Sequence, residues 1–272
     1  MENGFGKRVA ELRNKVREQV PLIHHITNVV VTNFTANGTL AMGASPVMAY
    51  AHEEVEEMVR LANALVLNIG TLTAVEVEAM VLAGREANRR GIPVLLDPVG
   101  AGATRYRLEA AKRILEQVSI TTVRGNAAEV AALTGLAWES RGVDSVGEHG
   151  NRIQLAKDAF KMLGITVAVT GPVDVVAGKS GVLTVENGVP MLGLVTGTGC
   201  LATGAVAAFT AVEQDEVLAA ASALAYYGLA AEVAAARAQG PGSFQMAFLD
   251  ELYRLSDQEL KEGVRITAVE WR

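Results

Sequence analysis

The sequence predicts an α/β fold in which helices cover both faces of a mostly parallel central sheet. Through the first 170 residues, short apolar and β-branched runs alternate with longer segments of helical periodicity. The short runs are continuously apolar, which is typical of strands that are buried on both faces. Half of the residues are hydrophobic, and 27 glycines among 272 residues supply the tight turns that this alternation needs. Together these observations favour a sheet between two layers of helices.

Six strands are expected in this part of the chain, each ending close to a Gly, Asn, Asp or Thr. They are Leu22–Ile26, Ala44–Met48, Ala64–Ile69, Pro93–Leu96, Thr121–Val123 and Thr166–Val169. Seven helices are expected to precede, connect and follow these strands. They are Lys7–Val20, Val30–Met42, Glu53–Asn63, Ala74–Arg90, Tyr106–Gln117, Ala127–Leu133 and Asn151–Leu163.

After Thr170 the pattern changes to short strands that are joined by hairpin turns. Gly-Lys-Ser-Gly and Asn-Gly are typical hairpin sequences, and they separate three runs at Val173–Ala177, Val182–Val185 and Met191–Leu194. Three helices are then expected to complete the chain. They are Gly199–Val212, Glu216–Ala238 and Phe244–Leu255.

No repeat or low-complexity linker divides the chain, and Glu139–Gly150 is expected to be a surface loop within one domain that spans residues 1–272. The charged N-terminus has no signal-peptide core. The apolar runs Cys200–Val212 and Val217–Ala231 are shorter than the roughly 20 residues of a membrane span. Their Ala and Gly content is typical of buried helices. We therefore expect no membrane partner.

The charge balance and the cysteine count restrict the partners and the compartment. The chain has 24 Lys and Arg against 30 Asp and Glu, a net charge of −6, and no basic block. This composition excludes nucleic acid as the main partner. The single cysteine, Cys200, excludes an intramolecular disulfide and indicates a reducing compartment, so we expect a cytoplasmic protein.

The segment Val-Thr-Gly-Thr-Gly-Cys at 195–200 is the most informative part of the sequence, because it follows a short strand and opens an apolar helix. Backbone N–H groups at a helix start favour an anion, so Gly197, Thr198, Gly199 and Cys200 are candidates for an anion hole. The same segment is also compatible with a plain turn between a strand and a helix, without a bound ligand. A dinucleotide fingerprint needs a strand that ends in an acidic residue about 20 positions on, whereas another helix begins there. A Walker loop is excluded because no Lys-Ser/Thr follows these glycines.

Cys200 has two interpretations. Free cysteines are commonly inert buried residues, but a thiol at a helix N-terminus has its thiolate favoured. A nucleophilic hydrolase would need a partner histidine, and His24, His25, His52 and His149 show no such pattern. His24 and His25 are adjacent on a strand, so they point to opposite faces and are expected to be structural.

Polar residues at three further strand ends point to phosphate chemistry. Asp97 and Glu129 are candidate Mg²⁺ ligands, Arg124 offers a fork to phosphate oxygens, and Thr170 offers a hydroxyl. Each has a plainer interpretation: Asp-Pro initiates turns, and Asn126 and Glu129 have capping-box spacing. With the glycine loop, the four strand ends indicate phosphoryl transfer.

Several segments in order along nearly the whole chain resemble the hydroxyethylthiazole kinase family of thiamine salvage, whose members have a ribokinase-like fold without a separate lid. These segments are Ile26-Thr27-Asn28, Gly43–Ala49, Asn68–Leu72, Leu96–Ala101, Arg124–Glu129, Val169–Gly171 and Gly197–Cys200.

The resemblance implies a role for each matching position. It places Arg124 and Thr170 against ATP, Met48 and Gly197 in the thiazole pocket with Asn28 and Gly70 nearby, Asp97 and Glu129 at Mg²⁺, and Cys200 where related kinases have an aspartate base. It implies phosphorylation of 4-methyl-5-(2-hydroxyethyl)thiazole by ATP, in a homotrimer with active sites between subunits. A hydroxymethylpyrimidine kinase, disfavoured by a cysteine at 200, and a non-catalytic binding trimer are the alternatives.

Overall fold

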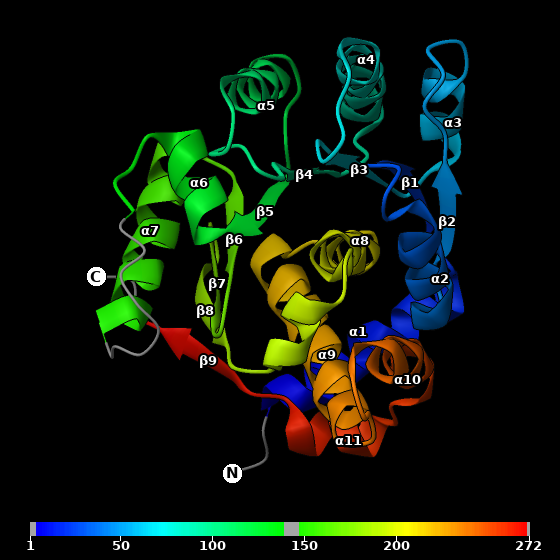
Figure 1. The fold of residues 1–272 in the computed structure, drawn as a ribbon, viewed down its shortest axis with the longest axis vertical. Helices are drawn as coiled ribbons and strands as arrows, with labels where there is room; N and C mark the ends of the chain where they lie inside the picture. The colour runs from blue at the N-terminus through cyan, green and yellow to red at the C-terminus, as the bar shows by residue number, and fades with distance from the viewer. Residues whose placement is uncertain (1–3, 139–146, 271–272) are drawn as a thin grey trace.

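The computed structural model describes residues 4–138 and 147–270. Within them, one sheet of nine strands runs in the order β2-β1-β3-β4-β5-β6-β7-β8-β9, with helices on both faces (Figure 1). The predicted α/β class with a mostly parallel sheet is confirmed. Most of the predicted loop Glu139–Gly150 lies outside the described residues, and α7 begins at Gly147.

Six strands of the sheet are parallel, as the buried apolar runs predicted. Each observed strand overlaps its prediction, and the ends differ by at most three residues. They are β1 (Leu22–Ile26), β2 (Ser45–Met48), β3 (Ala64–Asn68), β4 (Val94–Asp97), β5 (Thr122–Asn126) and β6 (Thr166–Thr170).

The helices form two layers, one on each face of the sheet (Figure 1). One layer contains α3 (Val55–Leu61), α4 (Ala74–Arg90), α5 (Arg105–Gln117), α6 (Ala127–Thr134) and α7 (Gly147–Leu163). The other contains α1 (Gly4–Gln19), α2 (Thr32–Met42), α8 (Thr198–Thr210), α9 (Glu216–Ala235), α10 (Pro241–Arg254) and α11 (Asp257–Gly263). Three buried clusters of apolar side chains pack against the sheet, one in the layer that contains α8 and α9 and two in the layer that contains α3 to α7.

The C-terminal third differs from the prediction in two places. The hairpin of β7 (Asp174–Gly178) and β8 (Gly181–Val185) is confirmed, but the predicted strand Met191–Leu194 is wrong, because Pro190–Leu194 forms the 3₁₀ helix η1. Proline at the first position favours a helical turn and cannot donate to a sheet.

The edge of β8 is occupied by a strand from the end of the chain. This strand, β9 (Ile266–Val269), pairs antiparallel with β8, so no edge is left there for Met191–Leu194. Neither β9 nor α11 was predicted. The start of α11 was nevertheless visible in the sequence, since Ser256 and Glu259 form a capping box.

Helix α9 (Glu216–Ala235) is mostly apolar because it lies inside the protein. It has 20 residues and is long and apolar enough to cross a membrane, but 83% of its most apolar window is buried. It packs against α8 and α10 and against β7 and β8. Its composition is therefore that of a core helix, as its Ala and Gly content predicted.

Candidate active site

The polar residues predicted at the strand ends gather along one side of the sheet, where the carboxyl ends of the parallel strands lie next to one another. Asn68 ends β3 and stands opposite Asp97 at the end of β4. On β5, Arg124 lies beside β6, which ends at Thr170. The start of α8 faces this edge.

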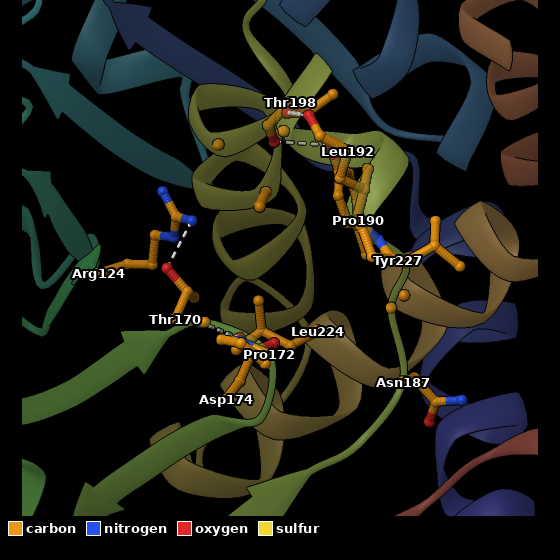
Figure 2. Close-up of a pocket in the computed structure, with 17 residues that line it drawn as sticks. Arg124, Thr170, Pro172, Asp174, Asn187, Pro190, Leu192, Thr198, Leu224 and Tyr227 are labelled. Carbon is orange, nitrogen blue, oxygen red and sulfur yellow. Dashed lines mark hydrogen bonds between the residues drawn. The ribbon is translucent and has the colours of Figure 1, made fainter. Parts of the chain in front are cut away.

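Arg124 and Thr170, the two predicted ATP-binding residues, are bonded to each other. Arg124 Nη2 donates to Thr170 Oγ1 at 2.7 Å (Figure 2). The Thr170 hydroxyl donates to the Gly125 carbonyl at 3.2 Å. Arg124 Nη1 lies 4.0 Å from Asp97 Oδ2. The guanidinium is thus held in one place, with N–H groups left for a bound anion.

The start of α8 has the geometry that an anion hole needs. Gly197 adopts φ +92°, which turns the chain into the helix, and no side-chain hydrogen bond caps this end. The first intrahelical bond runs from Leu201 N to the Gly197 carbonyl at 2.8 Å. The N–H groups of Thr198, Gly199 and Cys200 therefore have no partner within the helix.

This helix start lies directly against Arg124. A Cβ on Gly199 would lie 3.2 Å from Arg124 Nη1, so a larger residue at this position would crowd the guanidinium. The backbone N–H groups and the arginine therefore face the same space.

That space opens into a cavity of about 510 Å³. Arg124, Thr170, Thr198 and Gly199 line it, together with Asp174 (Figure 2). The other predicted site residues do not line it. They are Asn28, Met48, Gly70, Asp97, Glu129, Gly197 and Cys200. A second hollow, of about 700 Å³, lies at the opposite edge of the sheet and contains none of the predicted residues.

Asp97 is buried, with 1% of its surface exposed, and only one of its oxygens is bonded within the described residues. Oδ2 accepts from Asn68 Nδ2 at 2.9 Å and from Thr203 Oγ1 at 2.7 Å, whereas Oδ1 has no hydrogen-bond partner there. Burial raises the pKa of Asp97 to about 6, against the opposing charge of Arg124. The Asp-Pro turn is closed by backbone, from Ala101 N to the Pro98 carbonyl, so the carboxylate is not a turn cap.

Glu129 has the capping role that its spacing allowed. Its Oε2 accepts from Asn126 N at 2.8 Å, Asn126 Oδ1 accepts from Glu129 N at 2.9 Å, and Oε1 accepts from Gly100 N at 2.9 Å. Across residues 4–138 and 147–270, no group of three or more His, Cys, Asp and Glu side chains could hold a metal ion. A cation here would need ligands from a bound molecule or from water.

Cys200 is half-buried at the start of α8, and its Sγ accepts from Asn28 Nδ2 at 3.4 Å. Of the two interpretations of Cys200, the structure favours the plain thiol, because burial and then the charge of Asp97 raise the pKa of the thiol. The amide of Asn28, which donates to the sulfur, opposes this shift without reversing it. The resting group is a neutral thiol.

Met48, Asn28 and Gly70 lie at the carboxyl ends of β2, β1 and β3, on the other side of β4 from Arg124 and Thr170. Met48 ends the edge strand β2, opposite His25 on β1. Asn28 follows β1 and packs against Gly70, where a Cβ would lie 2.6 Å from Asn28 Nδ2. These three residues do not line the cavity beside Arg124, but Asn28 contacts Cys200 at the same helix start, where Gly197 and Gly199 also lie.

The histidines are structural, as expected where the structure describes them. His24 and His25 are fully buried, and burial lowers the pKa of both, that of His25 to about 3. His24 Nε2 bonds the Ala49 carbonyl at 2.9 Å, and His52 Nε2 bonds that of Val75 at 2.7 Å. The side chain of His149 lies outside the described part of the chain.

Two polar residues of the site were not predicted. Asn68 was part of a recognised segment but had no role, and its position at a strand end was the signal for it. Asp174 begins β7 and lines the cavity, and its Oδ1 accepts from Gly171 N at 2.9 Å. Burial raises the pKa of Asp174 to about 7. The sequence predicts it only as the second residue of a hairpin strand.

Comparisons with known proteins identify the family of this chain. Residues 13–258 match the hydroxyethylthiazole kinase family. A hydroxyethylthiazole kinase of Moorella thermoacetica is 55% identical over 96% of this chain and 98% of its own length.

Solved structures with the same fold include a hydroxyethylthiazole kinase protein and a ribokinase-like protein. The hydroxyethylthiazole kinase protein of Pyrococcus horikoshii OT3 is 43% identical, with a TM-score of 0.90 over 97% of this chain and 100% of its own. A ribokinase-like superfamily protein of Enterococcus faecalis V583, 13% identical, shares the fold with a TM-score of 0.64 over 90% of this chain and 93% of its own. The chain therefore belongs to the hydroxyethylthiazole kinase family and has its ribokinase-like fold.

Proposed function

We propose that this chain transfers the γ-phosphoryl group of ATP to the hydroxyethyl oxygen of 4-methyl-5-(2-hydroxyethyl)thiazole, which yields the thiazole phosphate and ADP. Family membership supports the substrate. One structural observation carries the chemistry: Arg124, fixed by Thr170, lies against the uncapped start of α8 at the wall of one cavity. This is an arrangement for binding and transferring a phosphate.

Each part of this arrangement has a task in the proposed transfer. The guanidinium of Arg124 neutralises phosphate oxygens and fixes their direction. The N–H groups of Thr198, Gly199 and Cys200 stabilise the charge that is spread over the transferring group. Because phosphoryl transfer has a loose transition state, positioning and charge stabilisation supply most of the catalysis.

We also propose that Mg²⁺ is held beside the phosphates by Asp97. The residues present fit this ion, since the buried Oδ1 of Asp97 lacks a partner in the described residues and Mg²⁺ usually takes one or two carboxylates plus phosphates and waters. The oxygens of Glu129 already accept backbone N–H groups, so Glu129 is proposed to act through a water. Bound Mg²⁺ supplies further neutralisation of phosphate charge.

Cys200 is proposed to orient the alcohol more than to remove its proton. Its thiol is neutral at rest, because burial raises its pKa. A neutral thiol is a weak base, and a loose transition state asks little of a base. Asn28, bonded to Cys200 Sγ, is proposed to lie in the thiazole pocket with Met48, Gly70 and Gly197.

We further propose that the protein is a cytoplasmic homotrimer in which residues 1–272 act as one domain. One sheet joins strands from both ends of the sequence, and Cys200 is a free thiol. Val29 and Val30 follow Asn28 directly and are 68% and 65% exposed. Exposed apolar side chains next to a site support its coverage by a second subunit. Light scattering should give three times the 28.6 kDa chain mass.

An ADP-release assay with several alcohols tests the proposed reaction. The thiazole alcohol should support turnover that depends on Mg²⁺, and hydroxymethylpyrimidine should support little. Preference for the pyrimidine would assign the related kinase activity instead. Binding of ATP and the thiazole alcohol with no ADP release would indicate a binding protein. Arg124→Ala is the matched inactive control, because it removes the guanidinium that faces α8.

A further inference from the structure

A continuous chain of hydrogen bonds links the buried carboxylate of Asp97 to the sulfur of Cys200 through two asparagines. Asn68 Nδ2 donates to Asp97 Oδ2 at 2.9 Å. Asn68 Oδ1 accepts from Asn28 Nδ2 at 3.0 Å, and the same Nδ2 donates to Cys200 Sγ at 3.4 Å. The chain thus joins the ends of β4 and β3, the segment after β1, and the start of α8.

The groups around Asn68 determine which way its amide points. The carboxylate of Asp97 accepts hydrogen bonds from Asn68 Nδ2 and also from Thr203, at 2.7 Å. On the other side, Gly70 N donates to Asn68 Oδ1 at 3.0 Å. A flipped Asn68 would place its NH₂ against the Gly70 N–H and its oxygen against the carboxylate. Both contacts would be repulsive, so the observed orientation is the one that the site permits.

The orientation of Asn68 in turn determines that of Asn28. Because Asn68 presents its oxygen, Asn28 must present its NH₂ group, and one of the two N–H bonds is used for Asn68. The second N–H is then available to Cys200 Sγ. Asn28 and Asn68 are 6% and 2% exposed, so solvent does not compete strongly for these bonds.

We propose that Asn68 is a positioning residue for the phosphoryl transfer: it fixes the amide of Asn28 so that an N–H bond points at Cys200 and the sulfur is a hydrogen-bond acceptor. The role in phosphoryl transfer rests on the proposed function, whereas the effect of Asn68 on the reactivity of Cys200 does not. An N–H bond to sulfur stabilises the thiolate relative to the thiol, because charge strengthens the bond. Loss of Asn68 therefore makes Cys200 less reactive even without substrate.

Alkylation of the protein tests this inference directly, because Cys200 is the single cysteine among 272 residues. The rate of modification by iodoacetamide is measured against pH in the wild type, Asn28→Ala, Asn68→Ala and the double variant. Each single variant should be alkylated about three- to tenfold more slowly below the thiol pKa, which is the effect of one weakened charged hydrogen bond. The double variant should be no slower than Asn28→Ala, since Asn68 acts through Asn28.

Thr203→Val is the matched control. It removes the other hydrogen bond to Asp97 Oδ2 but leaves the Asn28–Asn68 bond in place. Its alkylation rate should stay within about twofold of the wild type. The inference is overturned if Asn68→Ala is alkylated at the wild-type rate, if Thr203→Val slows alkylation as much, or if the two asparagine effects add in the double variant.

A substitute variant and a kinetic measurement complete the test. If Asn68→Ala does not give a native circular dichroism spectrum, Asn68→Ser replaces it with the same expectations, because its hydroxyl is too short to reach Asn28. Turnover by Asn68→Ala should show a lower kcat with an unchanged KM for ATP, whereas a raised KM for ATP at unchanged kcat would count against positioning of Cys200. Alkylation needs no substrate, so failure of the proposed reaction would appear separately, as absent ADP release by the wild type.

Discussion

Replacing Gly197 by alanine is expected to destabilise the protein and to displace the start of α8. The residue has φ +92°, and a Cβ there would lie 2.9 Å from Val31 Cγ1 and 3.1 Å from Phe34 Cδ1. The left-handed conformation costs alanine about 1–2 kcal/mol. The overpacked contacts add about 1–3 kcal/mol. The free energy of unfolding should therefore fall by about 2–5 kcal/mol.

The same displacement should reduce catalysis. The N–H groups of Thr198, Gly199 and Cys200 follow Gly197 directly, and the contacts are relieved by a shift of this turn or of the Val31 and Phe34 side chains by a few tenths of an ångström. Loss of one donor from such a site typically costs about 100-fold or more in kcat, so a partial displacement should cost at least about tenfold.

Gly91→Ala is the control for the backbone effect alone. Gly91 has φ +69° at the end of α4, a Cβ there would have no atom within 4 Å, and the residue lies at the opposite edge of the sheet. Its unfolding free energy should fall by about 1–2 kcal/mol, with kcat unchanged. Urea denaturation and ADP release measure both quantities. A Gly197→Ala protein as stable as Gly91→Ala and with wild-type kcat would refute the reasoning.

Three further changes test other parts of the site. Arg124→Lys keeps the charge but loses the fork that bonds Thr170, so the KM for ATP should rise about tenfold while that for the thiazole stays within about twofold; equal effects on both would contradict a phosphate role. Cys200→Ala should lower kcat about tenfold without abolishing ADP release, because a loose transition state needs little base catalysis; complete loss in a folded variant would indicate an essential base or nucleophile. Burial raises the pKa of Asp97 from 3.8 to about 6, so the folded protein keeps this proton to higher pH than the unfolded chain, and the free energy of unfolding falls as pH rises from about 4 to about 6. In urea denaturation without Mg²⁺, Asp97→Asn should therefore gain roughly 3 kcal/mol relative to the wild type across that window and stay level above it; a constant difference would show that Asp97 titrates normally.

Local patterns predicted most elements of the fold because each is decided by few residues. The parallel strands were visible as continuous apolar runs, and the capping box of Asn126 and Glu129 was visible as spacing alone. The prediction failed at Met191–Leu194, where an apolar run looks the same whether it joins a sheet or forms a 3₁₀ turn. Pairing of β9 with β8 decided that case, and a pairing between distant segments leaves no local pattern.

The roles of single side chains were harder to predict because they depend on surroundings. The helix start suggested an activated thiol at Cys200, but burial and the charge of Asp97 raise its pKa. Both causes come from residues that are distant in the sequence. Asn68 was seen only as part of a recognised segment, because its bonds to Asn28 and Asp97 exist only in the folded chain.

By itself, the sequence determined the α/β class, the family and the set of residues with chemistry at strand ends, because periodicity, turn residues and ordered motifs are local properties. Only the tertiary structure decided which of these residues meet. It bonded Arg124 to Thr170 and set Arg124 against α8, and it left one oxygen of Asp97 without a partner in the described residues. It also ordered the asparagines that reach Cys200. Distances, burial and the direction of a hydrogen bond depend on segments that are far apart in the chain, and these quantities set the chemistry of the site.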